Sequence, residues 1–503
     1  MLDIKTLKSG SDVRGRALAA DGKEAVLTPE IAGGIARAFL GYAAEKWGPI
    51  SRLAVGHDSR LTAMDLKEGI LKALKEPAAA APDGGLTVLD CGLTTTPAMF
   101  MTTKFPETDC AAAIMLTASH MPKDMNGLKF FVKGGGLEGK DIERILERAA
   151  TPSVSRPPLR RGEFLKDKFT DGLTVERENH FKIVKTDGLQ VYRAFLKNKF
   201  QTETGKEKPL TGRKLAVDAG NGAGGFYAGL LEELGADVSG SRYLEPDGSF
   251  PNHIPNPEDE SAMKAARAMV KESGAEAGIV FDADADRAGL VGRRGDINRN
   301  ALIALCAKLS AREYPGCTIV TDSVTHRALT PYIEGLGCRH RRFKRGYRNV
   351  IDEARRLRKE GVNAVLAIET SGHAAFYDNS FLDDGAYLIS YCLIRAAKLG
   401  KSFDELIADY KPPLEEKELR LPIAAADFKA AGADMLKRIE DEAKTRGWER
   451  IDGYEGIRVV SPEACLTARM SVHEPILVLN YESDIKGGCE DMHKIIRAVA
   501  YRA

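Results

Sequence analysis

Three short apolar runs, one in each third of the 503-residue chain, each end in a loop of polar side chains. The runs are Ile114–Leu116, Gly278–Phe281 and Val365–Ile368, and helix-like amphipathic stretches alternate with these and other apolar runs. Such alternation predicts α/β domains with mixed or mostly parallel sheets. Because ligands gather at the carboxyl ends of strands in α/β sheets, the three loops are candidate functional sites of repeated domains that face one cleft.

The same patterns predict individual elements and domain boundaries. Strands are expected at Leu53–Val55, Leu86–Asp90, Ala111–Leu116, Lys214–Val217, Ala277–Phe281, Cys317–Thr321 and Ala364–Ala367. Helices are expected at Asp141–Ala150, Ala262–Lys271, Val350–Lys359 and Phe428–Arg446. The length suggests about three or four domains. We place them at residues 1–186, 187–296, 297–409 and 410–503, with the Pro- and Arg-rich stretch 149–172 as a loop or linker.

The composition excludes several classes of partner. Lys and Arg total 73 against 72 for Asp and Glu, so nothing in the net charge of +1 favours nucleic acid or an anionic membrane surface. No apolar run approaches the ~18 residues of a membrane span. The eight cysteines are irregularly spaced without a C-x-x-C pair, which indicates a reducing compartment. The N-terminus does not resemble a secretory signal, so a cytoplasmic protein is expected.

Three aspartates alternate in the loop after the second apolar run: Asp282, Asp284 and Asp286. Residues two apart on an extended segment point to the same side, so three carboxylates are expected to converge. Hard carboxylate oxygens suit Mg²⁺. One alternative is a solvated acidic turn, over which we favour the metal site. A calcium loop of the helix–loop–helix type is excluded because Arg287 and Arg293 occupy its glycine and glutamate positions.

A serine, Ser119, follows the first apolar run, with His120 beside it and Lys129 ten residues on. A hydroxyl nucleophile needs activation or prior modification. A phosphorylated serine carries close to two negative charges, which Lys129 and a metal could neutralise. The alternative, favoured when the loop is taken alone, is a serine held in a turn by backbone hydrogen bonds. His120 does not indicate a catalytic triad, because neighbouring residues on a strand point apart and no G-x-S-x-G motif is present.

The loop after the third apolar run places Glu369, Ser371 and His373 in alternation. Carboxylate and hydroxyl groups on one side suit the hydroxyls of a sugar, and His373 could act as acid or base near neutral pH. A buried histidine satisfied by a neighbour is an equal alternative.

Two further loops are less specific. Near the C-terminus, Arg469, Ser471 and His473 could form a phosphate clamp, although a solvated turn is favoured without further context. The glycine-rich segment Asp218–Gly224 lacks both nucleotide-binding spacings, so a tight strand-to-helix turn is favoured there.

Taken together and in order, the loops resemble a known family. The segments TASHMPKDMNGLKFF, DADADR, ETSGH with FLDDGAY, and RMSVHEP resemble the four signature loops of the α-D-phosphohexomutase superfamily, which includes phosphoglucomutases and phosphomannomutases. GSDVRG, VGHDSR, CGLTTTP, DAGNGAGG and PDGSFPNHIPNP are also similar, so the resemblance covers nearly the whole chain. It implies four domains around a central cleft: three related α/β domains with mixed sheets and a smaller C-terminal α+β domain that binds phosphate.

The resemblance also implies residue roles. It implies one catalytic Mg²⁺ bound by the aspartates and completed by the phosphate on Ser119. Its implied catalytic residues are Ser119, Lys129, Arg14, His120 and His373; its metal ligands are Ser119, Asp282, Asp284 and Asp286; its substrate-binding residues are Arg287, Arg345, Glu369, Ser371, Arg469, Ser471 and His473. This chain departs from the family at Met121, where Asn is common, and at Met470, Val472 and His473 in the last loop. The loops RGYRN and RMSVHEP are similar to a divergent, plant-like branch.

The implied activity is an intramolecular phosphotransfer in carbohydrate metabolism. Phosphorylated Ser119 would convert a hexose 1-phosphate, of glucose or mannose, to the 6-phosphate through a hexose 1,6-bisphosphate, which also serves as activator. A monomer or homodimer is expected. The alternatives are a phosphoglucosamine mutase, a non-catalytic sugar-phosphate binder and a metal-dependent phosphatase.

Overall fold

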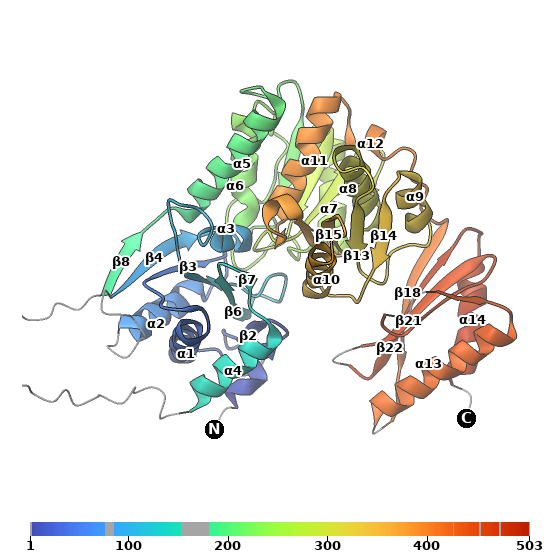
Figure 1. Cartoon of the computed structure of the whole chain (residues 1–503), viewed down its shortest axis with the longest axis horizontal. Coiled ribbons are helices and arrows are strands. Elements are labelled where there is room, and N and C mark those ends of the chain that lie inside the picture. The colour runs from blue at the N-terminus through green and yellow to red at the C-terminus, as the bar shows by residue number, and fades with distance from the viewer. Residues whose placement is uncertain are drawn as a thin grey trace, which may run out of the picture. The chain divides into compact units, whose positions relative to one another are not determined.

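The computed structural model describes residues 3–75, 85–151, 181–425, 427–451, 454–471 and 474–501 (Figure 1). The chain forms two compact units. The first contains residues 1–273 with 280–286, and the second contains residues 274–279 with 287–503. The chain passes from one unit to the other after Ser273, within strand β10 (Ala277–Phe281) and after Asp286.

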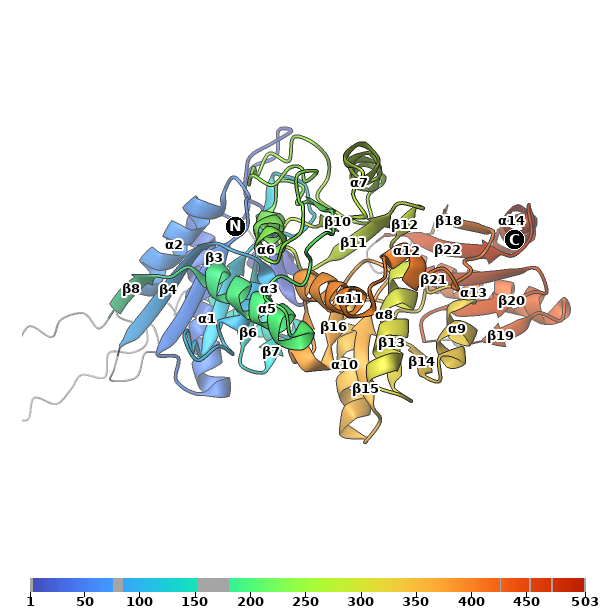
Figure 2. The same ribbon diagram turned by 90° about the horizontal axis from the view of Figure 1, so that it is seen from above.

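A mixed sheet of eight strands is the centre of the first unit. Its strands are β1 (Lys8–Ser9), β2 (Asp12–Arg16), β3 (Arg52–His57), β4 (Leu86–Leu93), β5 (Ala112–Leu116), β6 (Met125–Val132), β7 (Gly135–Gly136) and β8 (Phe181–Lys185). Their order is β1-β2-β6-β5-β3-β4-β8, with β7 paired to β6. The strands β5, β3, β4 and β8 run parallel, whereas β6 is antiparallel to both β5 and β2. Figure 2 shows β8 at the free edge beside β4.

Helices cover both faces of this sheet. One face carries α1 (Pro29–Trp47), α2 (Ala63–Lys75) and α4 (Gly139–Ala150), and the other carries α3 (Thr96–Met101) and α5 (Gly188–Thr204) (Figure 1). The side chain of Thr28 caps the first turn of α1 and Pro29 occupies its first position, which are both favourable at a helix start. Between helices and sheet lies a core that includes Phe39, Ile114 and Phe130.

The rest of the first unit follows α5. Strand β9 (Leu215–Asp218) leads through the 3₁₀ turn η3 (Ala223–Gly225) into α6 (Phe226–Glu233), and α7 (Glu260–Ser273) precedes β10. Both β9 and β10 are buried along their whole length. The glycine-rich segment Asp218–Gly224 runs from the end of β9 into η3 and α6, so it is the predicted strand-to-helix turn.

The second unit begins with a hairpin and a mixed sheet. The hairpin pairs β11 (Ala288–Gly292) with β12 (Asp296–Ile297). The sheet has the order β14-β13-β15-β16-β17. Its strands are β13 (Thr318–Thr321), β14 (Arg339–Arg342), β15 (Ala364–Ile368), β16 (Ala374–Phe376) and β17 (Leu382–Asp383). Its helices are α8 (Asn300–Glu313), α9 (Leu329–Gly335), α10 (Tyr347–Lys359), α11 (Gly385–Leu399) and α12 (Phe403–Leu406), with the 3₁₀ turn η4 (Tyr377–Asn379).

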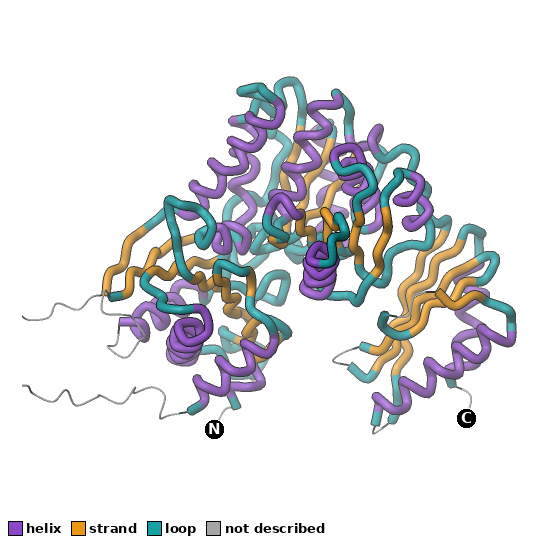
Figure 3. Tube along the Cα trace, viewed as in Figure 1, coloured by secondary structure: helices purple, strands orange, loops and turns teal. Residues whose placement is uncertain are grey.

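The C-terminal part is an antiparallel sheet with helices on one face (Figure 3). Its strand order is β18-β22-β21-β20-β19. The strands are β18 (Glu415–Pro422), β19 (Glu449–Ile451), β20 (Ile457–Val460), β21 (Ala464–Met470) and β22 (Ile476–Ser483). The helices α13 (Phe428–Thr445) and α14 (Gly488–Ala500) pack on the sheet over a core that includes Ile439, Leu466 and Ile496.

The predicted elements are confirmed to within a few residues, and the differences have physical reasons. All seven predicted strands and all four predicted helices are present. Strand β18 was not predicted because most of its side chains are exposed and its first half, Glu415–Glu418, is entirely charged. Helix α11 was not predicted because it is buried around most of its circumference, which removes the amphipathic pattern. Residues 152–172 of the predicted linker lie outside the described residues.

No helix among the described residues is both long and apolar enough to cross a bilayer.

Candidate active site

The serine loop of the first unit leaves the carboxyl end of β5 and turns sharply at Ser119. The backbone of Ser119 has a φ of 52°, in the left-handed region that residues with a Cβ seldom adopt. Its amide donates to Thr117 Oγ1 at 2.8 Å, and its hydroxyl donates to Asp282 Oδ2 at 2.8 Å. The side chain is buried, so the nucleophile candidate points at the carboxylate loop rather than at solvent.

His120 lies closer to Ser119 than the sequence suggested. Its Nδ1 is 3.3 Å from Ser119 Oγ. The prediction that these side chains point apart is wrong, because Ser119 lies in a left-handed turn and the strand has already ended at Leu116. The imidazole can therefore share a proton with the serine hydroxyl.

The three aspartates converge, although the reason given from the sequence is wrong. The loop after β10 is a turn, in which Ala285 has a φ of 55° and its amide donates to the carbonyl of Asp282. It is not an extended segment. Even so, carboxylate oxygens of Asp282, Asp284 and Asp286 all lie within 4.8 Å of one another, and all three residues are buried.

Lys129, on β6, is the positive charge within this acidic cluster. Its Nζ lies 2.8 Å from Asp284 Oδ2 and 2.5 Å from Asp286 Oδ2. Thr96, at the start of α3, adds a hydroxyl at 2.5 Å from Asp284 Oδ2. Burial and the charge of Asp286 act to raise the pKa of Asp284, but Lys129 and Thr96 outweigh them and hold this pKa below its usual value. Asp284 is therefore ionised at neutral pH.

The donor set fits a hard divalent cation. It consists of carboxylate oxygens gathered in one place, which is the chemistry that Mg²⁺ prefers. Oδ1 of Asp284 is buried and has no hydrogen-bond partner among the described residues. A buried carboxylate oxygen left unpaired is unfavourable unless it coordinates an ion or a water.

The glycine-rich turn Asp218–Gly224, called the glycine turn below, contacts the loop Asp282–Asp286 directly. This second loop, which carries the three aspartates, is called the metal loop below because it is the candidate metal site. Gly222 packs against the backbone of Ala283, where an added Cβ would lie 2.6 Å from both Cα and the carbonyl oxygen. The amide of Ala223 donates to that same carbonyl at 2.8 Å. The sequence predicted only a turn here, because the contact joins segments 60 residues apart in the chain. Arg14, on β2, is paired with Asp12 at 2.9 Å.

In the second unit, Glu369, Ser371 and His373 lie in a tight turn between β15 and β16. The amide of Glu369 donates to the carbonyl of His373, and the amide of Gly372 donates to that of Glu369. The segment is therefore not extended. Glu369 accepts from the amide of Gly346 at 2.6 Å, and the hydroxyl of Ser371 lies 3.4 Å from Glu369 Oε2. Burial, and then the negative charge of Asp322, raise the pKa of Glu369 to about 7.

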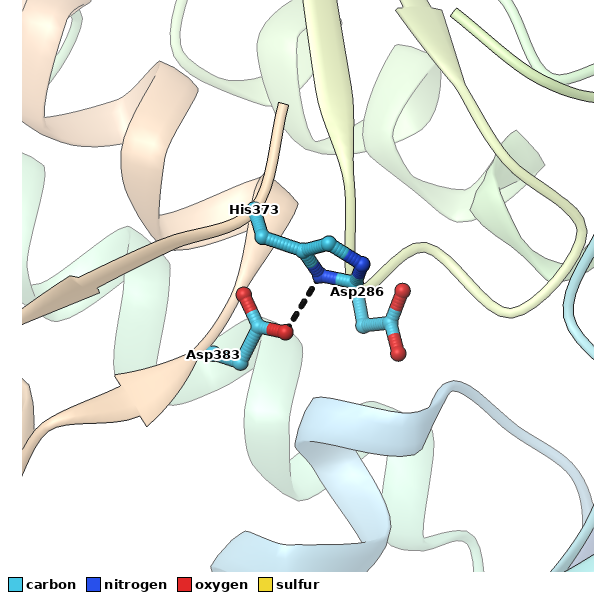
Figure 4. Close-up of side chains that lie close together, drawn as sticks. All are labelled: Asp286, His373 and Asp383. Carbon is cyan, nitrogen blue, oxygen red and sulfur yellow. Dashed lines mark ion pairs between the residues drawn. The ribbon is translucent and has the colours of Figure 1, made fainter. Parts of the chain in front are cut away.

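His373 is held on two sides (Figure 4). Its Nδ1 forms an ion pair with Asp383, and its ring stacks on Tyr347 with the centroids 5.0 Å apart. Arg287 is buried and forms an isolated β-bridge with His373. The histidine thus has the neighbour that the alternative interpretation required, and one orientation of its ring is fixed.

Two arginines of the second unit, Arg345 and Arg469, lie close enough to repel each other. Burial lowers the pKa of Arg469, and the positive charge of Arg345 lowers it further. Nε of Arg469 is buried without a hydrogen-bond partner among the described residues. Two cations held together in this way suit a bound anion such as phosphate. Ser471 accepts from the amide of Glu474 at 3.2 Å, whereas His473 lies outside the described residues.

Glu455 is a site residue that the sequence did not reveal. It accepts from the hydroxyl of Ser323 and, at 3.2 Å, from the amide of Arg345. Thr96 was missed for the same reason: each acts on a residue far away in the chain. The segment CGLTTTP, which contains Thr96, was the one signal that could have indicated it.

Comparison with known proteins gives a consistent result. Family models described as phosphoglucomutase/phosphomannomutase match as α/β/α domain I over residues 5–154, domain II over 190–295 and domain III over 298–412. The chain is 30% identical to a phosphoglucomutase of Neisseria gonorrhoeae over 477 residues, which cover 94% of this chain and 93% of the relative. It is 29% identical to a phosphomannomutase/phosphoglucomutase of Pseudomonas aeruginosa, with 94% and 91% covered.

A solved structure shows the same fold. It is a phosphoglucomutase/phosphomannomutase family protein from Burkholderia thailandensis, with a TM-score of 0.76 at 24% identity. The match covers 98% of this chain and 97% of that one.

The contact between Gly222 and the metal loop leads to a first prediction. A methyl group in Gly222→Ala would meet the backbone of Ala283 at 2.6 Å and displace the loop. We expect the affinity for Mn²⁺, measured by electron paramagnetic resonance as a probe of the site, to fall at least tenfold. The control is Gly34→Ala, since a Cβ at Gly34 meets nothing within 4 Å. Equal Mn²⁺ affinity in the two variants would contradict the proposed support.

The raised pKa of Glu369 predicts a pH-dependent stability. Between about pH 4.5 and 7 the native carboxyl keeps a proton that the unfolded one releases, so the wild type loses stability as the pH rises. Glu369→Gln removes this loss. Between pH 5 and pH 8, the variant should gain on the order of 2 kcal/mol relative to wild type in urea unfolding. Exposed Glu334→Gln is the control, and a pH-independent difference for Glu369→Gln would refute the prediction.

Proposed function

The chain belongs to the phosphoglucomutase/phosphomannomutase family and is a phosphohexomutase, and from this premise we propose that Ser119 carries the transferred phosphoryl group. The observation that supports this most directly is the direction in which the Ser119 hydroxyl points. It lies 2.8 Å from Asp282, the first carboxylate of a buried acidic cluster. A phosphorylated serine in this place requires positive charge nearby, because its phosphate would otherwise be repelled by the aspartates.

Phosphorylation of Ser119 would bring close to two negative charges beside Asp282. We propose that Asp282, Asp284 and Asp286 hold one Mg²⁺, with the Ser119 phosphate as a further ligand. When bound, the ion neutralises charge on the phosphoryl oxygens. Lys129 supplies a fixed positive charge from the protein itself.

Arg14 and His120 complete the proposed reacting end. We assign Arg14 as the second flanking cation. His120, whose Nδ1 lies 3.3 Å from Ser119 Oγ, can supply the proton that Ser119 Oγ takes up when its bond to phosphorus breaks.

The second unit supplies the proposed sugar and phosphate contacts. Glu369 and Ser371 would bind sugar hydroxyls. Arg287, which directly follows the loop of the three aspartates, would also contact the substrate. Arg345 and Arg469, with Ser471 and His473, would bind the phosphate that is not being transferred. His373, fixed by Asp383, is positioned to move a proton at a sugar hydroxyl.

The proposed reaction conserves every phosphoryl group. The bond from Ser119 Oγ to phosphorus breaks as the 6-hydroxyl of a hexose 1-phosphate attacks, and the hydroxyl proton passes to a protein base. The hexose 1,6-bisphosphate then reverses its orientation, and Ser119 Oγ attacks its 1-phosphoryl group. The bond from that phosphorus to the C1 oxygen breaks, the serine proton passes to a protein base, the C1 oxygen takes up a proton, and hexose 6-phosphate leaves. Positioning and charge neutralisation supply most of the acceleration. Glucose and mannose phosphates are the proposed substrates, with the bisphosphate as activator. The domain limits and cytoplasmic location expected above remain predictions.

Ser119→Ala tests the phosphoryl carrier. Without the hydroxyl no phosphoenzyme forms, so turnover of glucose 1-phosphate, mannose 1-phosphate and glucosamine 1-phosphate should fall by at least 10³-fold. Coupled assays with Mg²⁺ and a trace of hexose 1,6-bisphosphate measure this. The control is Ser51→Ala, an exposed serine just before β3. Full activity of Ser119→Ala would refute the proposal, and net release of inorganic phosphate by the wild type would indicate a phosphatase instead.

Arg469→Met tests the second phosphate site. The change keeps an apolar stem in place of the methylene groups of arginine, removes the charge and relieves the repulsion by Arg345, so the fold should be retained. Loss of a charge-assisted hydrogen bond should raise KM roughly 10- to 100-fold. Arg420→Met on the exposed strand β18 is the control. An unchanged KM would remove Arg469 from the binding site.

A further inference from the structure

Two loops of the first unit meet behind Ser119. One follows β3 and contains Asp58 and Arg60, and the other follows β5 and contains Thr117. Asp58, Arg60 and Thr117 are all buried. Most polar groups buried to this extent are hydrogen-bonded, so their partners indicate what they do.

Both backbone polar groups of Ser119 are bound by these side chains. Its amide donates to Thr117 Oγ1 at 2.8 Å, and its carbonyl accepts from the guanidinium of Arg60. The left-handed φ of 52° is unfavourable for a residue with a Cβ. Rotation of Ser119 to an ordinary conformation would break both hydrogen bonds, so the network stabilises the conformation that directs Oγ to Asp282.

The guanidinium of Arg60 shapes the rest of the serine loop. Besides the carbonyl of Ser119 it donates to those of Met121 at 2.7 Å, Pro122 at 2.8 Å and Met125 at 2.8 Å. The ring of Phe250 lies against it, with the centroid 5.3 Å from Cζ. One planar cation thus binds four carbonyls, a geometry that the single ammonium of lysine cannot reproduce.

The carboxylate of Asp58 fixes the direction of the hydrogen bonds that Thr117 makes. It accepts from Thr117 Oγ1 at 2.6 Å and from the amide of Arg60 at 3.0 Å. A threonine hydroxyl has a single proton. Because that proton is given to Asp58, the lone pairs of Thr117 Oγ1 face the amide of Ser119.

We infer that Asp58, Arg60 and Thr117 are positioning residues for the phosphoryl carrier, an inference that rests on the proposed function of Ser119. The hydrogen bonds of their side chains described above are with the backbone of the two loops and with one another. They act through the conformation of Ser119, holding its hydroxyl oxygen in line with the group that it receives and releases. A misplacement of about 1 Å at a reacting centre can slow a reaction by about 10²-fold.

The test compares Thr117→Val with Thr117→Ser. The first removes the hydroxyl at nearly constant volume, and the second keeps it. Each variant is loaded with excess glucose 1,6-bisphosphate and mixed with glucose 6-phosphate, and the phosphate on Ser119 is followed by quenched-flow mass spectrometry. For Thr117→Val we expect transfer to slow about 10- to 100-fold with KM within about twofold, whereas Thr117→Ser should stay within about threefold of wild type.

Thr108→Val is the matched control. Thr108 is also buried and donates to the carbonyl of Thr102 at 2.8 Å, but it precedes β5 and so lies at the opposite end of that strand from Ser119. It should transfer phosphate at the wild-type rate. If Thr117→Val does not fold, Arg60→Lys replaces it, with the same expected loss of rate at an unchanged KM.

The outcomes separate the inference from its premise. If wild-type Ser119 never takes up phosphate, the proposed function fails. If it does, the positioning role is overturned by a wild-type rate in Thr117→Val (or in Arg60→Lys, where that replaces it). It is also overturned by a Thr117→Ser variant as slow as Thr117→Val, since packing of the methyl group would then explain the loss, or by an equal loss in Thr108→Val.

Discussion

The site of the first unit depends on the ion pairs that Lys129 makes with Asp284 and Asp286. Like charges gathered in a buried place repel one another strongly, and an unpaired buried charge is highly unfavourable. The ammonium lies 2.8 and 2.5 Å from two of the carboxylates and helps to hold the pKa of Asp284 below its usual value, so that this carboxylate remains ionised inside the protein. Because Lys129 lies on β6 and the aspartates follow β10, this charge compensation also joins two segments more than 150 residues apart.

Around this cluster, backbone and side chains fix the loops in shape. Gly222 allows the metal loop to rest on the glycine turn, Thr96 binds Asp284, and Arg60 binds the serine loop. None of these groups needs to react. Their contribution is preorganisation, since donors and charges that are already in place need no reorganisation when the reaction occurs. The chemistry proposed for Ser119 is therefore a property of several loops rather than of one residue.

The sequence predicted the buried strands and the identity of the polar loops well, because apolar runs and the residues that follow them are local signals. It did not predict loop shape. Alternation suggested extended loops at Asp282–Asp286 and Glu369–His373, whereas both are turns, and Ala285 at a φ of 55° carries no sequence mark that a glycine would. Contacts across the fold, such as Thr117 with Asp58, were likewise inaccessible, since no local pattern links residues 59 apart. The edge strand β18 shows the same limit, because most of its side chains are exposed.

Lys129 has one more consequence, which concerns ion selectivity. A cation that enters the acidic cluster from solution does not meet bare carboxylates, because it must compete with an ammonium group tethered to the same fold. Its net binding energy is therefore the difference between the ion pairs that the carboxylates make with the entering cation and those that they make with Lys129. A monovalent ion gains little from that exchange, whereas a small divalent ion gains more. If the cluster holds a cation as proposed, these ion pairs would favour an ion of high charge density before any substrate arrives.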